Sequence, residues 1–433
     1  MSSDSSREVL IIGAGPAGLA AARALSERRI PYDQVERHDG VGGIWDIDNP
    51  GTPMYSSAHF ISSRTMSDFP GFPMPEDYPD YPSQRQILDY LTAFADAFGL
   101  TERITFGRSV THIEKDGERW RVTFDDGSRQ DYSFVVAATG TQWHPRLPEW
   151  PGDFDGEIRH SREFRDADDL VGKRVLVIGA GNSGCDIACD VGRRAEQTFL
   201  SVRRGYWFIP KHIFGIPSDV FADSGPHLPL AVEQRVFGAM LRTLNGDVTR
   251  LGLPKPDHRL FETHPILNTE ILARLQHGDV IAKPDIDHLD QDGVVFTDGS
   301  REQIDVIIAA TGYRHAIPYA QNLFGPEDHP DDLYLSVFSR RHRGLMAMGF
   351  IETNSGAYRL FDSSARIVTG YIDDCLHHPE QARRFDELIE RHHPDLTGGI
   401  RFIDSPRHRD YVDSTTLAKM YDRVLRQMHW AAA

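Results

Sequence analysis

The chain has 433 residues, of which 40% are hydrophobic and 26% charged, and a formal net charge of -17. This length allows two or three domains with sizeable cores, and the composition is ordinary for a globular protein. The negative charge argues against a nucleic-acid or anionic-membrane partner, and no apolar run is long enough to cross a bilayer. Three cysteines make no disulfide framework, the 20 histidines show no metal-ligand spacing, and the N-terminal MSSDSS lacks a signal-peptide core. We therefore expect a cytoplasmic protein without a metal site.

Residues 8–36 contain a glycine-rich turn between two predicted strands. The apolar residues 8–12 predict a buried strand, GxGxxG follows at once, and residues 19–28 are good helix formers. A second strand is predicted over Tyr32–Val35 and ends at Glu36, near the spacing of about 20 residues that a dinucleotide fingerprint requires. The fingerprint residues are Gly13, Gly15, Pro16, Ala17 and Gly18.

Each part of this fingerprint has a physical role in holding a pyrophosphate. The first glycine permits the tight turn, the second lets the pyrophosphate approach the backbone, and the third lets helix pack on strand. The helix N-terminus faces the anion, and Glu36, with Arg37 beside it, is placed to meet the adenosine ribose. A purely structural glycine turn is the alternative, but the strand, helix and acid favour nucleotide binding.

Two further segments of the N-terminal part are predicted to lie near a cofactor or a substrate. In Gly43, Ile44 and Trp45 a glycine lets the backbone approach a bound molecule and a tryptophan forms an apolar wall, with a turn over a core tryptophan as the alternative. Five prolines in residues 67–83 exclude a helix or a central strand and predict a long extended loop. Ser83 and Gln86 then form a capping-box pattern that starts a helix.

An internal repeat indicates a second unit of the same kind. DGERWRVTFDDGSRQDYSFVVAATG, ending at Gly140, resembles DGVVFTDGSREQIDVIIAATG, ending at Gly312. Each predicts a hairpin followed by a buried strand, and each follows its own GxGxxG. The second fingerprint comprises Gly179, Gly181, Asn182, Ser183 and Gly184, and the repeated ends add Thr139 and Gly140 to the first unit and Ala310, Thr311 and Gly312 to the second.

The charge after the second strand differs between the two units. Where the first unit places Glu36, the second places Arg203 and Arg204, shortly after Ser201. An acid repels a 2′-phosphate, whereas an arginine fork binds it. The first unit is therefore predicted to bind a plain adenosine ribose and the second NADPH, with a solvated arginine pair as the alternative.

The two units predict an α/β fold of two nested Rossmann-like dinucleotide-binding domains. Residues 1–150 and 310–433 would form an FAD domain that is interrupted by an NADPH domain over residues 155–305. Prolines break residues 205–262 into an irregular insertion, in which residues 230–244 predict a helix. A further helix is predicted over residues 362–376. The insertion and the proline-rich loop are expected to shape the substrate cleft.

Two dinucleotide sites in one chain imply electron transfer between NADPH and a flavin. Disulfide reductases need a redox cysteine pair, but Cys185 and Cys189 lie one turn apart on a helix that should be buried, so we interpret them as core residues. Flavin reductases need no substrate pocket, whereas monooxygenases add oxygen activation and a substrate cleft. A non-catalytic dinucleotide sensor is disfavoured by the two intact fingerprints.

A motif between the two units favours the monooxygenases. Residues 154–164, FDGEIRHSREF, match FxGxxxHxxx[F/Y] in full, and this resembles the identifying motif of the flavin-containing monooxygenases. The match continues through both fingerprints, residues 42–45, 201–203 and 310–313, and the segment from His264 to Pro284, so it covers nearly the whole chain.

The resemblance implies an NADPH-dependent enzyme like N,N-dimethylaniline monooxygenase. Flavin reduced by NADPH would take up O2 as a C4a-hydroperoxide, which oxygenates a small molecule with a nucleophilic sulfur or nitrogen. Baeyer–Villiger oxygenation of ketones is less expected, because Arg165 follows the motif and Asn49 precedes Pro50 where ketone oxygenases differ. An NADPH oxidase or flavin reductase that makes H2O2 or passes electrons to a partner is the alternative. Dimers are common in similar proteins, and a chain without a C-terminal anchor resembles the soluble bacterial-like branch.

The same resemblance supplies candidate catalytic residues, namely Asn182, His160 and Ser62. Asn182 would contact NADP⁺ near the flavin. Many members carry an asparagine where this chain places Ile61, and His59 or Ser62 are the polar neighbours that could replace it. Without a replacement, we expect more H2O2 per NADPH consumed. His160 is interpreted as a hinge bonded to backbone, because the mechanism needs no general acid there.

Overall fold

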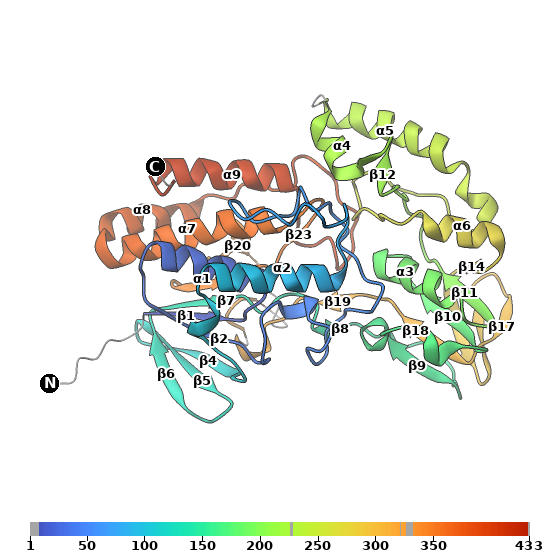
Figure 1. The fold of residues 1–433 in the computed structure, drawn as a ribbon, viewed down its shortest axis with the longest axis horizontal. Helices are drawn as coiled ribbons and strands as arrows, with labels where there is room; N and C mark the ends of the chain where they lie inside the picture. The colour runs from blue at the N-terminus through green and yellow to red at the C-terminus, as the bar shows by residue number, and fades with distance from the viewer. Residues whose placement is uncertain (1–7, 226–227, 321, 326–331, 432–433) are drawn as a thin grey trace.

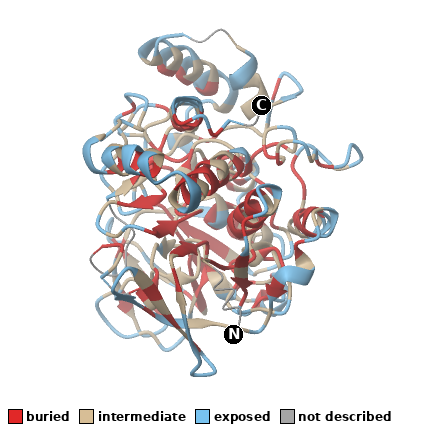
Figure 2. Cartoon of the chain, turned by 90° about the vertical axis from the view of Figure 1, so that its left-hand side faces the viewer, coloured by how far each residue is buried: buried red, intermediate tan, exposed pale blue. Residues whose placement is uncertain are grey.

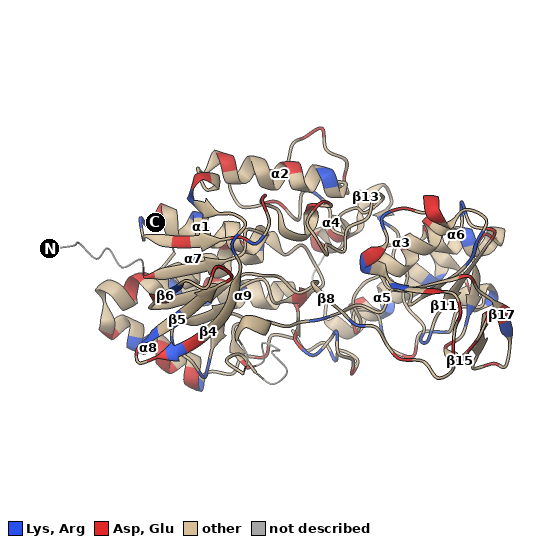
Figure 3. Cartoon of the chain, turned by 90° about the horizontal axis from the view of Figure 1, so that it is seen from below, with Lys and Arg blue, Asp and Glu red and all other residues tan. Residues whose placement is uncertain are grey.

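The computed structural model describes residues 8–225, 228–320, 322–325 and 332–431. Two sheets lie toward opposite ends of the long axis of the molecule (Figure 1). Acidic and basic residues are interspersed over both halves in the view of Figure 3. None of the described helices combines the length and the apolar character needed to span a membrane, and within the described ranges no His, Cys, Asp and Glu side chains gather as a metal-binding group.

The seven-stranded sheet takes its strands from both ends of the chain. They are β1 (Val9–Ile12), β2 (Tyr32–Val35), β3 (Ile104–Thr105), β7 (Phe134–Ala137), β20 (Leu333–Tyr334), β21 (Phe338–Ser339) and β22 (Leu345–Ala347). The order is β20-β21-β22-β7-β1-β2-β3. β1 is parallel to β2 and β7, with Val9 opposite Tyr32 and Phe134. All four residues of β1 are buried, which explains its continuous apolar run.

The five-stranded sheet comes from the middle of the chain. Its strands are β9 (Glu157–His160), β10 (Arg174–Ile178), β11 (Gln197–Ser201), β14 (Ile281–Lys283) and β18 (Val306–Ala309), in the order β14-β11-β10-β18-β9. β10 lies between β11 and β18 just as β1 lies between β2 and β7. The predicted α/β class with two Rossmann-like units is confirmed.

The internal repeat of the sequence is also a repeat of structure. β4 (Val110–Asp116), β5 (Arg119–Phe124) and β6 (Arg129–Tyr132) form a three-stranded antiparallel sheet before β7. β15 (Ile286–Asp290), β16 (Gly293–Phe296) and β17 (Arg301–Gln303) form the same kind of sheet before β18. The ATG phrases follow β7 and β18 and therefore lie at the carboxyl ends of equivalent strands.

Helices bury the inner strands, as Figure 2 shows by its red interior. They are α1 (Pro16–Glu27), α2 (Gln84–Ala97), α3 (Asn182–Val191), α6 (Glu270–His277), α7 (Tyr358–His377), α8 (Pro379–Arg391) and α9 (Ser414–Gln427). The capping box of α2 is confirmed, because the Ser83 hydroxyl accepts from Gln86 N and the Gln86 side chain accepts from Ser83 N. Cys185 and Cys189 are free and buried in α3, as interpreted.

Two predictions of regular structure were wrong in extent. α7 starts at Tyr358 rather than 362, and the added turn buries Tyr358 and Leu360 in the core. The insertion 205–262 is more regular than expected. It contains β12 (His212–Ile213), β13 (Ile216–Pro217), α4 (Ser218–Ser224) and α5 (Leu230–Asn245).

The insertion stands above α3 and α6 in Figure 1 and docks on the proline-rich loop. The Tyr81 hydroxyl of that loop accepts a hydrogen bond from Ser218 N, and Asp219 accepts one from Ser63 N, just before the loop. His212 lies 2.9 Å from the Asp80 carboxylate. The two segments expected to shape a cleft are therefore in direct contact, although they are far apart in the sequence.

Candidate dinucleotide sites

The first crossover, from β1 to α1, has the geometry that a pyrophosphate requires. Gly13 has φ +109°, and a Cβ there would lie 2.6 Å from Ala138 O. A Cβ on Gly18 would lie 2.1 Å from Gly13 O, so helix and strand can pack only without it. α1 starts after Gly15 with no side-chain cap and no acid in its first turn. Its first N–H groups are therefore open to an anion.

The second crossover, from β10 to α3, repeats this geometry. Gly179 has φ +102°, with a Cβ there 2.7 Å from Ala310 O, and a Cβ on Gly184 would lie 1.9 Å from Gly179 O. Around Gly181 a Cβ would meet no atom within 4 Å, so the backbone faces open space. α3 also lacks a side-chain cap. Both crossovers thus fit a dinucleotide.

Glu36 is held rigidly at the carboxyl end of β2. Its side chain is buried, and its two oxygens accept hydrogen bonds from Ala14 N at 2.7 Å and His38 N at 2.9 Å. A carboxylate oxygen has lone pairs beyond these, so the group can still accept from a ribose diol. Arg37 stacks its guanidinium 4.0 Å from the Trp143 ring, and burial lowers the pKa of Arg37.

The Gly43–Trp45 turn, a short 3₁₀ helix, lies against the first crossover. A Cβ on Gly15 would meet Gly43 Cα at 3.6 Å, and Gly42 N donates to Ala14 O. Asn49 donates to Gly43 O at 3.1 Å, which fixes the turn. Trp45 is half-buried against Phe60, with ring centroids 4.9 Å apart. Its ring therefore packs against the core in addition to any part it has in lining the site.

Asn182, the first residue of α3, is bonded to the segment that follows the insertion. Its Nδ2 donates to Pro265 O and its Oδ1 accepts from Leu267 N, both at 2.9 Å. The side chain therefore positions residues 265–267 against the helix that would face the nicotinamide nucleotide. Ser183 lies beside it and is exposed.

Sequence reasoning missed a buried link between the two units at Asp186 of α3. Tyr55 OH donates to Asp186 Oδ2 at 2.9 Å, and Asn268 Nδ2 donates to Asp186 Oδ1 at 2.6 Å. Burial raises the pKa of both Asp186 and Tyr55. The signal in the sequence was an acid on the buried side of an amphipathic helix. The sequence around Asp186 does not indicate which residues it pairs with.

His160 uses both ring nitrogens on the backbone. Its Nδ1 accepts from Arg162 N and its Nε2 donates to Gly312 O, both at 3.1 Å. The side chain is buried, and burial lowers the pKa of His160. These bonds tie β9 to the ATG end after β18 and leave no ring nitrogen for proton transfer.

The residues around Ile61, which stands where the family carries an asparagine, differ in burial and in hydrogen bonding. Ser62 is buried and accepts from Ser67 Oγ at 2.6 Å. His59 is exposed and pairs through its backbone with Ser83, whereas Ile61 is half-buried. Among the described residues, no side-chain hydrogen bond orients His59, so Ser62 is the better placed polar neighbour.

The other predicted residues lie at the carboxyl ends of the strands. Ser201 is buried and donates to Pro284 O at 2.8 Å, so it fixes the strand end rather than facing outward. Arg203 is exposed just beyond it. Thr139 bonds to the Tyr319 hydroxyl at 3.2 Å, and Thr311 donates to Arg146 O. The two ATG ends are thus braced by different partners.

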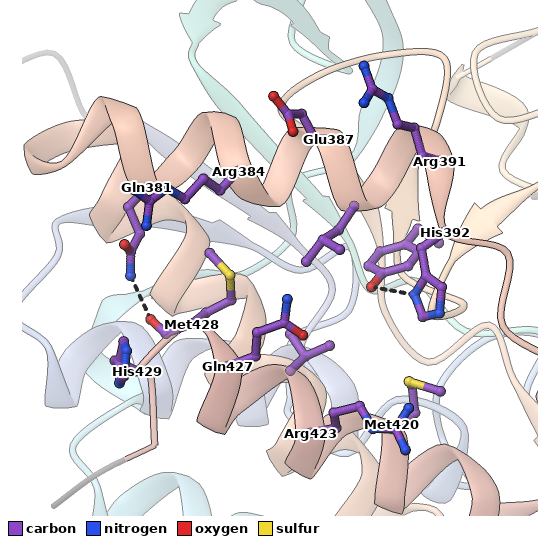
Figure 4. A pocket seen from close by; sticks show the side chains of 13 residues that line it. Gln381, Arg384, Glu387, Arg391, His392, Met420, Arg423, Gln427, Met428 and His429 are labelled. Atoms are coloured by element: carbon purple, nitrogen blue, oxygen red, sulfur yellow. Dashed lines mark hydrogen bonds between the residues drawn. The ribbon is translucent and has the colours of Figure 1, made fainter.

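A groove of about 710 Å³ lies elsewhere, between α8 and α9 (Figure 4). Arg384 and Glu387 project from α8, and Arg423 and Gln427 from α9. No residue predicted for either nucleotide site lines it. The groove is therefore separate from the crossovers.

Two dinucleotide-type crossovers, one followed by an acid and one by an arginine pair, are the arrangement expected of a protein that binds two different dinucleotides. Residues 6–420 match the model of the flavin-binding monooxygenase-like family. The chain belongs to this family, so it is a flavin monooxygenase-type oxidoreductase whose cofactors are FAD and NADP(H).

Named relatives agree with this assignment. Flavin-containing monooxygenase 5 of Rattus norvegicus is 30% identical over 96% of this chain and 83% of its own length. Indole-3-pyruvate monooxygenase YUCCA1 of Oryza sativa subsp. japonica is 32% identical over 71% of this chain and 77% of its own. The solved structure of OTEMO with FAD and NADP has a TM-score of 0.72 at 17% identity, covering 97% of this chain and 98% of that one, which is a likeness of fold alone.

Proposed function

We propose that the chain transfers one atom of O2 to a soft sulfur or nitrogen of a small molecule, with electrons from NADPH. The observation that carries this proposal is the matched pair of uncapped crossovers with opposite charge at their strand ends, Glu36 in one and Arg203 with Arg204 in the other. FAD is assigned to the first unit, residues 1–150 and 310–433, and NADPH to the second, residues 155–305.

The protein residues in this proposal bind, orient and enclose. When bound, FAD supplies electron storage and oxygen activation. The N–H groups at the start of α1 and α3 hold the two pyrophosphates, and Glu36 accepts from the adenosine ribose. Asn182 holds residues 265–267 against the start of α3, where the nicotinamide nucleotide would bind. His160 holds the junction of the two units through Gly312 and acts as a positioning residue.

The heteroatom substrate class rests on the residue after the motif at 154–164. Arg165 donates through Nη1 to Met54 O at 3.1 Å and to Arg162 O at 2.8 Å, so it ties the junction to the loop after Thr52. It replaces the Trp or Pro of ketone oxygenases. Dimethylaniline monooxygenase [N-oxide-forming] 2 of Macaca mulatta is 30% identical over 95% of this chain. The fold is shared with cyclohexanone monooxygenase, at a TM-score of 0.66, so the substrate class is argued from residues.

An NADPH oxidase is the second candidate, and Ile61 favours it. An aliphatic side chain at position 61 donates no hydrogen bond to the flavin or nicotinamide, so any replacement falls to the neighbouring Ser62, whose oxygen already accepts from Ser67. Oxygen reduced without a substrate would then leave as H2O2.

One assay separates these functions. The holoenzyme is given NADPH with a thioether (thioanisole), a tertiary amine (N,N-dimethylaniline) or a cyclic ketone, and product, NADPH and H2O2 are measured together. Sulfoxide or N-oxide in proportion to NADPH supports the proposal. Lactone as the main product, or H2O2 alone with every substrate, overturns it. A cytoplasmic location and a homodimer stay predictions.

A further inference from the structure

Four arginines from separate parts of the chain gather near the carboxyl edge of the five-stranded sheet. Arg203 follows β11, and Arg314 ends β19 (Tyr313–Arg314), which follows β18. Arg146 directly follows β8 (His144–Pro145), the antiparallel partner of β19, and Arg146 N donates to Gly312 O at 2.9 Å. Arg409 comes from the C-terminal segment before β24 (Tyr411–Val412). β10, β11 and β18 end at this edge, where open α/β sheets bind their ligands.

The segment that carries Arg409 is anchored by the two residues before it. Arg407 pairs with the Glu352 carboxylate at 3.1 Å. His408 Nε2 accepts from His264 N at 2.9 Å, beside the 265–267 segment that Asn182 holds. Arg409 is therefore brought to the second unit by contacts that its neighbours make, and its own guanidinium is exposed.

The positive charge of the cluster is not compensated within the described part of the chain. No carboxylate there forms an ion pair with any of the four guanidiniums. None of the four guanidiniums donates a hydrogen bond to a described residue. Most other described arginines form an ion pair or a side-chain hydrogen bond, as Arg174 does with Asp305. Burial lowers the pKa of Arg146, and the charges of Arg314, Arg409 and Arg203 lower it further. Like charges held together in this way favour a bound anion.

We propose that Arg146, Arg314 and Arg409 join Arg203 in a cage for the 2′-phosphate of NADP(H). The inference rests on the proposed function, because it requires NADPH in the second unit. A phosphate monoester is close to a dianion at neutral pH and has three acceptor oxygens, which matches several guanidiniums better than one. Residues outside the second fingerprint, on the paired strands β8 and β19 and in the C-terminal segment, then contribute to the selection of NADPH over NADH.

Binding of adenosine 2′,5′-bisphosphate, compared with 5′-AMP, tests the cage without flavin chemistry. Titration calorimetry on the holoenzyme would compare the wild type with R146A, R314A and R409A. Loss of one charge-assisted contact is expected to weaken the bisphosphate about tenfold and to leave 5′-AMP within about twofold. Arginine-to-lysine variants at the same positions should recover part of the loss, and the wild-type affinity should fall as ionic strength rises.

R383A is the matched control, because Arg383 is exposed on α8 and takes no part in either site. FAD content and the thermal midpoint of each variant establish that it is folded; the backbone bonds of residue 146 survive the R146A change. If the three variants bind both nucleotides like R383A, the cage is wrong even where NADPH still reduces the flavin. If the wild type binds neither nucleotide and consumes no NADPH, the proposed function fails instead.

Discussion

The buried Tyr55–Asp186–Asn268 link gives a quantitative test of how the two units are joined. Asp186 accepts from both neighbours. The orientation of the Asn268 amide is fixed, because its Oδ1 accepts from Ile271 N at 2.9 Å, so its Nδ2 can only donate. We expect D186N to be nearly neutral and D186A to be severely destabilising.

The difference follows from counting donors and acceptors. In D186N the new Oδ1 accepts from Asn268, and the new amide donates to the Tyr55 oxygen, since a phenol can donate or accept. The substitution also removes a charge that burial disfavours, as the raised pKa of Asp186 shows. Y55F removes one hydrogen bond to a charged group, worth about 1.5–3 kcal/mol. D186A leaves two buried donors unpaired and should cost about 3 kcal/mol or more.

Urea and thermal midpoints of the holoenzyme would be measured for the three variants and for the Y55F/D186N pair. Midpoints are used because a chain with two units need not unfold in one step. The expected order of stability is wild type and D186N, then Y55F, then D186A. A D186A midpoint equal to that of D186N, or no change in Y55F, would refute the reasoning.

Three further outcomes are expected. R203A/R204A should raise KM for NADPH far more than for NADH, and equal rises measured in steady-state kinetics would reject the phosphate role. I61N should lower the H2O2 released per NADPH consumed, and an unchanged ratio in a peroxide assay would show that Ser62 or another group already supplies the polar contact. Burial lowers the pKa of His408 to about 4, so the folded protein binds this proton less tightly than the unfolded chain. The contribution of neutral His408 to stability is complete above about pH 6.5 and is lost as the pH falls toward 4. Thermal midpoints measured across this pH range should fall less in H408Q than in the wild type.

Features set by short stretches of chain were predictable from the sequence. The packing of Gly18 depends on Gly13 in the same crossover, so residue type and spacing were sufficient to predict it. The start of α7 was not predictable, because its first residue, Tyr358, packs against Phe60 and Phe69, which are far away in sequence. The link between Tyr55 and Asp186 was not predictable for the same reason, because the two residues come from separate segments. The position of Arg409 near Arg203 was not predictable either, because these residues also come from separate segments.

Backbone geometry does not distinguish the two crossovers, so the choice of nucleotide has to come from charge. Gly13 and Gly179 have φ of +109° and +102°, and both helices start uncapped. At about 5 Å and an effective dielectric of about 20, one carboxylate repels each unit of phosphate charge by about 3 kcal/mol, so Glu36 alone suffices to reject a 2′-phosphate. The converse exchange is harder. Glu36 also accepts from Ala14 N and His38 N, and an arginine there would leave both donors unpaired. E36R should therefore cost FAD retention without creating an NADPH site, which absorbance of the purified protein and 2′,5′-bisphosphate titration would measure.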